Sequence, residues 1–424
     1  MKRGFYTIMS AQFLSSLADN ALFVAAVELL RSQHADEWQR AALVPMFALF
    51  YVVLAPFVGA YADSRPKGQV MLVSNSIKVL GCLMMLFGVH PLLAYAVVGL
   101  GAASYSPAKY GILTELLPPQ DLVKANGWIE GLTIASIILG VLLGGQLVGP
   151  QVGGWLLQAV PTGLNWSAQE AAIACLVVIY GAAAWANTRI PLTGVDLRPI
   201  PSNPLALLPD FWHCNRLLWK DKLGQISLST TTLFWGVSGN LRYIVLAWAT
   251  VALSYNTTQA STLVGVVAIG TALGAVMASM RMRLEHAPRV MTLGILMGLL
   301  VVLMVFIRSV EVAAPFLILL GALGGFLVVP MNALLQHRGH MLMGAGRSIA
   351  VQNFNEQACI LALGFLYSSA TGMGLSAFAA IAAFGLLVAS VMWLIKKWHQ
   401  RNTVLHAEEL ERLYQIARGS NGSH

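Results

Sequence analysis

Six ionisable side chains stand inside long apolar stretches of this sequence, where a charge is costly. They are Asp19, Lys78, Lys109, Glu130, Arg242 and Glu356. One ionised group at the centre of a bilayer costs about 2.5–3.5 kcal/mol on insertion scales, so such residues pair with one another or serve a function. These six are therefore the first candidates for binding or moving a charged substrate.

When the sequence is aligned with itself at an offset of 223 residues, Asp19 aligns with Arg242 and Pro107 aligns with Pro330. An Asp–Arg pair can bind a zwitterionic or anionic group, or can break and re-form between two states of a protein. The alternative is a structural bridge, although a buried ion pair is seldom a net stabiliser compared with apolar packing. Asn20 adds an amide to the same region. We expect a substrate-binding role for this group.

Lys109 lies in the segment SPAKYG, directly before Tyr110, which we assign to the same candidate site. Pro107 removes a helical hydrogen bond nearby, so freed carbonyls can face water. Lysine acts as a point-charge ligand for phosphate. The alternative is a lysine that snorkels toward the membrane surface, because Glu115 follows six residues later.

Glu130 and Glu356 occupy corresponding apolar stretches of the two halves, although the shift is 226 residues there. The run QNFNEQ around Glu356 is polar for such a stretch and contains Asn353, and Asn332 lies in the second-half equivalent of SPAKYG. These residues could form a gate or part of a binding cavity, or only interhelical hydrogen bonds. For Lys78 we expect snorkelling or packing rather than contact with a substrate.

The elements that position these residues must be membrane helices. Of 424 residues, 57% are hydrophobic and 10% are charged, against about 25% charged in soluble domains. This balance excludes a soluble globular protein and a disordered one. Twelve apolar stretches are long enough to span a bilayer, and the alternation of a membrane β-barrel is absent. The sequence predicts an all-α membrane protein with twelve transmembrane helices.

A segment with five prolines, 189–222, divides these stretches six and six. We predict an N-terminal six-helix bundle (1–188), a linker (189–222), a C-terminal six-helix bundle (223–398) and a tail (399–424). Of the 26 Lys and Arg residues, 20 fall in loops on one side, three on the other and three inside spans. The positive-inside rule then places both termini and the linker in the cytoplasm, and it explains the net charge of +8 without nucleic acid.

Two parallel six-helix repeats joined by a cytoplasmic linker resemble the plan of the major facilitator superfamily. The loop GAYADSRPKG also resembles a loop signature of that superfamily, in which basic residues clamp an Asp and a helix N-terminus. On this resemblance Asp63, Arg65 and Lys67 form a gate. Pro66 stands where the signature has its second glycine, and the second-half copy has lost the acid, so a generic basic loop is the alternative.

Several longer segments are similar to bacterial lysophospholipid transporters, a family within that superfamily. They include AQFLSSLADNAL (11–22), GAASYSPAKYGILTEL (101–116), GGFLVVPMNALLQHRG (324–339) and GAGRSIAVQNFNE (344–356). The resemblance implies a central cavity lined by helices 1, 4, 7 and 10. It also implies site roles for Asp19, Lys109 and Arg242.

The same resemblance implies a function. Lysophospholipids, mainly lysophosphatidylethanolamine, would move across the bacterial inner membrane to the cytoplasmic leaflet by alternating access. An acyltransferase/acyl-acyl-carrier-protein synthetase would be the functional partner that re-acylates them. The transporter itself would be a monomer in the lipid bilayer.

Two rival functions belong to different classes. A drug/proton antiporter of the same fold would also use an acid within the membrane, but Lys109 and Arg242 would oppose a cationic drug. A membrane enzyme would need a nucleophile or a metal motif, and no Walker loop, HExxH or Ser/His/Asp arrangement is present. The sequence therefore predicts a transporter that is not an enzyme and needs no cofactor or metal.

Overall fold

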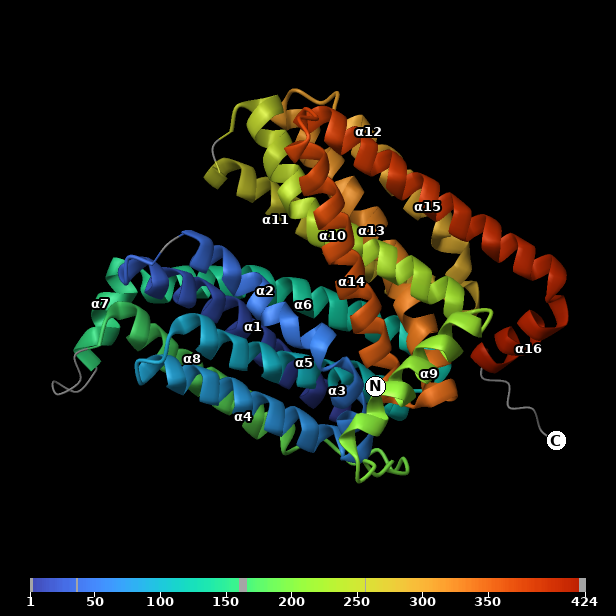
Figure 1. Ribbon diagram of the computed structural model, residues 1–424, viewed down its shortest axis with the longest axis horizontal. Helices are drawn as coiled ribbons and strands as arrows, with labels where there is room; N and C mark the ends of the chain where they lie inside the picture. The colour runs from blue at the N-terminus through green and yellow to red at the C-terminus, as the bar shows by residue number, and fades with distance from the viewer. Residues whose placement is uncertain (1–2, 36, 160–165, 256, 419–424) are drawn as a thin grey trace. The chain divides into compact units, whose positions relative to one another are not determined.

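The computed structural model describes residues 3–35, 37–159, 166–255 and 257–418. Within these ranges every regular element is helical (Figure 1). The helices divide between two compact units, and the boundaries fall within α6, α9 and α14 and one residue before the end of α5. Unit 1 comprises Met1–Glu115, Ala135–Phe211 and Gly344–Val351. Unit 2 comprises Leu116–Ile134, Trp212–Met343 and Gln352–His424.

Unit 1 is formed mainly by the first half of the chain. Its helices are α1 (Arg3–Ser32), α2 (Glu37–Val53), α3 (Ala55–Ser64), α4 (Lys67–Leu86), α5 (Pro91–Leu116), α7 (Pro150–Ala159), α8 (Ala168–Asn187), the second part of α6 (Pro119–Val148) and the start of α14 (Ala345–Gly372). Helix α8 packs against both α1 and α4. The polar side chains of these three helices are therefore brought to a common interior.

Unit 2 contains most of the second half. Its helices are α10 (Gly224–Leu253), α11 (Thr257–Arg281), α12 (Met291–Met304), α13 (Val310–Met343), α15 (Ala377–Leu405), α16 (Ala407–Ala417), and the remaining parts of α6 and α14. A 3-10 helix, η2 (Leu284–Val290), precedes α12. Helix α13 packs against α10, α11 and α12, and α15 packs against α10 and α12.

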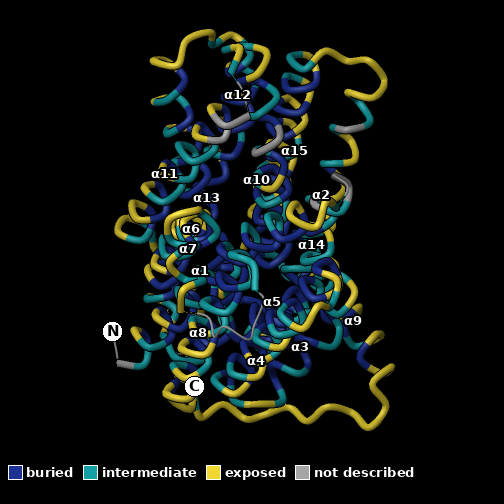
Figure 2. The backbone as a smooth tube through the Cα atoms, turned by 90° about the vertical axis from the view of Figure 1, so that its left-hand side faces the viewer, coloured by how far each residue is buried: buried dark blue, intermediate teal, exposed yellow. Residues whose placement is uncertain are grey.

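The prolines of the segment between the two halves of the chain predict that it is not one continuous helix, and the structure agrees. Residues 190–203 lack regular structure and are mostly exposed, and the 3-10 turn η1 (Pro204–Ala206) and α9 (Leu207–Lys220) follow. Figure 2 shows exposed residues recurring along the long helices as well as in the loops. Many of the exposed side chains on the helices are large and apolar, among them Leu80, Val178 and Leu386, as expected of helices that face lipid.

Eight described helices are long and apolar enough to cross a membrane, or nine if the bent pair Ala42–Val53 and Ala55–Ser64 is one span. Helices α5 and α14 are long but are not among them. They carry Lys109 and Glu356, and the polar runs around these residues lower their apolar character. The prediction of an all-α membrane protein is confirmed, while the count of twelve spans stays a prediction.

Glycines allow the closest helix contacts within each unit. A Cβ atom on Gly140 or Gly144 of α6 would lie 2.6 or 2.7 Å from a backbone carbonyl oxygen of α1. In unit 2, a Cβ atom on Gly274 of α11 would lie against a backbone carbonyl oxygen of α13, and one on Gly325 of α13 would lie against a carbonyl oxygen of α11. Small residues at this spacing let backbones approach and gain dispersion contacts.

Candidate functional site

The interior of unit 1 holds a buried ion pair that joins α1, α4 and α8. Lys78 Nζ lies 2.7 Å from Asp19 Oδ2, and the Tyr180 hydroxyl donates a 2.6 Å hydrogen bond to Asp19 Oδ1. The Lys78 side chain is 1% exposed and that of Asp19 is 20% exposed. Opposite charges at this distance compensate each other, which makes the burial of either one tolerable.

Further polar and aromatic groups surround the Lys78 ammonium. It donates to Ser15 Oγ at 2.9 Å, and Ser15 donates in turn to Asn75 Oδ1 at 2.7 Å. The ring centroids of Tyr105 and Tyr180 lie 5.0 and 5.6 Å from Nζ. Carboxylate, hydroxyl and ring faces together form the set of groups that stabilises an ammonium ion.

This arrangement bears on two expectations. Of the two alternatives for Lys78, snorkelling and packing, packing fits its position, because its ammonium is buried on a carboxylate of the neighbouring helix. Asp19 is paired within unit 1, whereas its expected partner was Arg242, whose side chain lies outside the described residues. Asn20, the next residue, donates its side-chain amide to the carbonyl of Ser16 on the same helix at 2.8 Å.

Lys109 and Tyr110 lie together on α5, and both are half-buried. The Lys109 ammonium stands 4.5 Å from the centroid of the Tyr110 ring. Helix α5 continues through Pro107, two residues before the lysine. The structure thus places both predicted residues side by side, and their role as a phosphate site stays a prediction.

A second polar cluster lies in unit 2, where α13 meets α14. Gln352 donates from Nε2 to Asn332 Oδ1 at 3.0 Å and to Glu356 Oε1 at 2.8 Å. Glu130 of α6 and Glu356 are both buried. Asn353 is half-buried beside this cluster. The contact between Gln352 and Asn332 is an interhelical hydrogen bond, and a transport role for this cluster stays a prediction.

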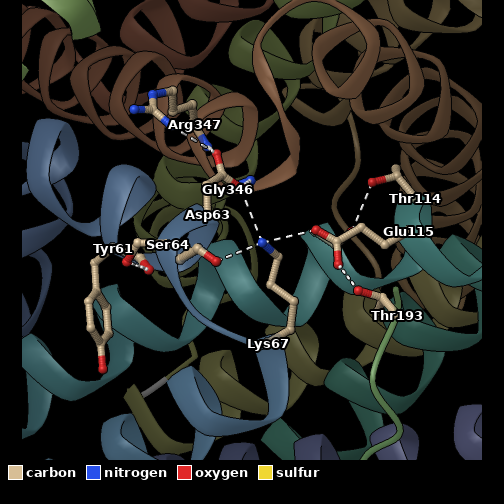
Figure 3. A network of polar contacts seen from close by, with 11 residues as sticks. Tyr61, Asp63, Ser64, Lys67, Thr114, Glu115, Thr193, Gly346 and Arg347 are labelled. Atoms are coloured by element: carbon tan, nitrogen blue, oxygen red, sulfur yellow. Dashed lines mark hydrogen bonds and ion pairs between the residues drawn. The ribbon is translucent and has the colours of Figure 1, made fainter. Parts of the chain in front are cut away.

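The predicted gate contains a dense network around Asp63 at the end of α3 (Figure 3). Its carboxylate accepts hydrogen bonds from the backbone N–H groups of Gly346 at 2.6 Å and Arg347 at 3.0 Å. Lys67 Nζ lies 3.1 Å from Asp63 Oδ1, and Arg347 Nη1 lies 3.5 Å from Oδ2. Asp63 therefore caps the positive end of α14 while two cations neutralise it.

The network extends beyond the residues that sequence reasoning identified. Lys67 also pairs with Glu115 at 3.0 Å, and Thr193 donates to that carboxylate at 2.8 Å. Arg347 donates to Asp210 at 2.9 Å. Arg65, the third predicted gate residue, is exposed at the C-cap of α3. The run GAGR at the start of α14 was the available signal for the missing partner, because a Gly-rich helix start is free to approach a carboxylate.

Glycines make the close approach of α3 and α14 possible. Gly344 has φ +95°, a conformation that other L-residues rarely adopt. A Cβ on Gly346 would lie 2.8 Å from Asp63 Oδ1, and one on Gly59 would lie 2.7 Å from the Ala350 side chain. Larger residues at these positions would separate the carboxylate from the N–H groups that it caps.

The sequence model of the Major Facilitator Superfamily matches residues 8–355. The chain belongs to the major facilitator superfamily. It is 40% identical to the lysophospholipid transporter LplT of Klebsiella pneumoniae subsp. pneumoniae over 403 residues, which cover 94% of this chain and 96% of that protein. It is also 40% identical to LplT of Escherichia coli O1:K1 over 402 residues, 94% of this chain and 97% of that protein.

Solved structures give the same fold for this superfamily member. The crystal structure of the human organic anion transporter MFSD10 (TETRAN) matches with a TM-score of 0.72 at 13% identity, over 94% of this chain and 100% of that one. The predicted fold class is thereby confirmed, and so is the prediction of a multi-pass membrane transporter rather than an enzyme.

Proposed function

We propose that this superfamily member transports lysophospholipids by alternating access. The observation that carries the proposal is the 40% identity, along 94% of the chain, to proteins named as lysophospholipid transporters. The chemistry of the chain supports it. A lysophospholipid has one phosphate and one acyl chain, so a carrier needs few buried charges among otherwise apolar helices.

We assign the phosphate to Lys109 and Arg242, and further polar contacts with the substrate to Asn20 and Tyr110. An exposed phosphate oxygen would accept charge-assisted hydrogen bonds from these cations. Asp19 remains a candidate ligand for a cationic part of the head group, although Lys78 already holds one of its oxygens. The second cluster of Glu130, Asn332, Asn353 and Glu356 supplies further candidate contacts on the transport path.

We assign the gate to Asp63 and Lys67, with Arg65 as an outer basic residue. The capping of α14 by Asp63 and the pairing of Lys67 support this role, because they join segments from opposite halves of the sequence. Breaking and re-forming these contacts would accompany the change of access.

Several finer features belong to the same proposal. The main substrate is lysophosphatidylethanolamine, moved toward the cytoplasmic leaflet of a bacterial inner membrane, where an acyltransferase/acyl-acyl-carrier-protein synthetase re-acylates it. Both termini are cytoplasmic, as the distribution of Lys and Arg favours. The transporter works as a monomer.

The test is transport by the purified protein in liposomes that contain no other protein. Radiolabelled lysophosphatidylethanolamine is added outside, and the fraction that becomes protected from extraction by albumin is followed over time, with and without ion gradients. We expect protein-dependent protection that is slower in an Asp19→Asn variant. A cationic dye is measured in parallel. Movement of the dye without movement of the lipid would favour the antiporter, and movement of neither would reject lipid transport.

A further inference from the structure

The ammonium site in the interior of unit 1 is already occupied by the protein's own lysine. Lys78 Nζ is 2.7 Å from Asp19 Oδ2 and 2.9 Å from Ser15 Oγ, and two tyrosine rings lie within 6 Å of it. An aminoethyl head group presents the same primary ammonium. The site that could have bound this part of a substrate is therefore satisfied internally.

Asp19 is the one charged group of this pair that has accessible surface. Its side chain is 20% exposed, whereas that of Lys78 is 1% exposed. The hydrogen-bonding neighbours Tyr180 and Ser15 are also buried. An approaching head group would meet Asp19 first, and the charge that it meets is the net charge of Asp19 and Lys78 together. With both ionised, that net charge is zero.

We propose that Lys78 is a specificity-determining residue: by neutralising Asp19 it allows the transporter to accept anionic as well as ammonium-bearing lysophospholipids. The inference rests on the proposed function and extends it to the choice of head group. Without Lys78, the carboxylate of Asp19 would attract an ammonium and repel a second negative charge. Without Asp19, the lysine would do the opposite.

Four variants separate this role from a structural one. Lys78→Met removes the charge but keeps an unbranched apolar side chain, and Asp19→Asn removes the opposite charge. The double variant Lys78→Met/Asp19→Asn restores neutrality without the ion pair. Ser74→Ala, one turn earlier on α4, is the matched control, because Ser74 is equally buried but its hydroxyl donates to the carbonyl of Val70 on its own helix.

The measured quantity is the ratio of initial uptake rates for lysophosphatidylethanolamine and lysophosphatidylglycerol in liposomes. We expect Lys78→Met to raise the ratio about tenfold and Asp19→Asn to lower it about tenfold, each corresponding to about 1.4 kcal/mol. The double variant and Ser74→Ala should stay within about twofold of the wild-type ratio. A structural role would reduce both uptake rates together and leave the ratio unchanged.

The outcomes are distinguishable. If the wild-type protein takes up both lipids but neither single variant changes the ratio, the inference is overturned and the proposed function still stands. Absence of wild-type uptake overturns the proposed function and the inference with it. If Lys78→Met does not fold, the uptake ratios of Asp19→Asn and of the double variant are compared instead, because these two proteins differ only in the residue at position 78.

Discussion

Replacing Asp63 with asparagine should release the start of α14 from α3. The carboxylate accepts from the N–H groups of Gly346 at 2.6 Å and Arg347 at 3.0 Å, and from Lys67 at 3.1 Å. An asparagine keeps one acceptor oxygen for Gly346 and turns an NH₂ group toward Arg347, so the charge-assisted bond from the Arg347 N–H and the ion pair with its guanidinium are lost. If each contact contributes about 1.5 kcal/mol, the arrangement in which α14 is attached to α3 is destabilised by about 3 kcal/mol. This corresponds to roughly a hundredfold change in the attachment equilibrium.

A cysteine placed at Ser348 reports this equilibrium. Ser348 is 0% exposed, and its hydroxyl has no hydrogen-bond partner among the described residues, so Ser348→Cys should disturb little. The four native cysteines are first replaced. The variant is then labelled with a membrane-impermeant maleimide in inside-out vesicles. We expect Asp63→Asn to raise the labelling rate about a hundredfold, up to the rate of an exposed thiol.

Asp210→Asn is the matched control for this experiment. Asp210 also bonds to Arg347, but its side chain is 41% exposed. An ion pair that is open to solvent contributes about 1 kcal/mol or less, so the labelling rate should rise no more than about fivefold. Equal labelling of Asp63→Asn and wild type, at an unchanged melting temperature, would show that the carboxylate does not hold α14 in place.

Three further predictions follow from single contacts. Lys109→Ala should weaken the apparent affinity for every phosphate-bearing lysolipid by about tenfold to a hundredfold, and Lys109→Arg should recover part of that affinity. Concentration-dependent uptake measures the apparent affinity, and an unchanged value would mean that the lysine only snorkels. Gly59→Val should raise maleimide labelling at position 348, because even a Cβ atom there would lie 2.7 Å from a side chain of α14, whereas Gly131→Val extends into open space and should not. Arg338→Met should lower the melting temperature, because Asp221, which lies 2.6 Å from the guanidinium, would be left buried without this cation at a cost of about 3–5 kcal/mol. Adding Asp221→Asn should restore much of the lost stability. If it restores none, the packing of the arginine stem is what stabilises the protein.

Local patterns in the sequence were enough for the helical class and for part of the polar network around Asp63. Apolar length and composition predict membrane helices without knowledge of their packing. Asp63 and Lys67 are four residues apart, so their pairing across the short loop from α3 to α4 depends on few unknown angles. Gly140 and Gly144 are four residues apart in α6, a spacing typical of close helix packing, and both meet the backbone of α1.

The partners of Asp19 could not be predicted in the same way. Lys78 is 59 residues away and Tyr180 is 161 residues away, on two different helices. The internal repeat directed attention to Arg242, but a repeat relates equivalent positions of the two halves and carries no information about contacts inside one half. The rotation of α4 about its axis decides whether Lys78 faces lipid or the interior of unit 1, and an apolar sequence with a weak hydrophobic periodicity does not specify that rotation.

In the proposed gate, Lys67 would keep its charge paired when the contact with α14 breaks. It lies 3.1 Å from Asp63 and 3.0 Å from Glu115, whose other oxygen accepts from Thr193. All the groups that α14 contributes to Asp63 come from Gly346 and Arg347, so they are lost together when this helix start moves away. Asp63 and Glu115 then still hold Lys67 between them. Because that remaining trio has its own pairing, separation costs mainly the bonds to α14, a cost of a few kcal/mol that substrate binding can offset.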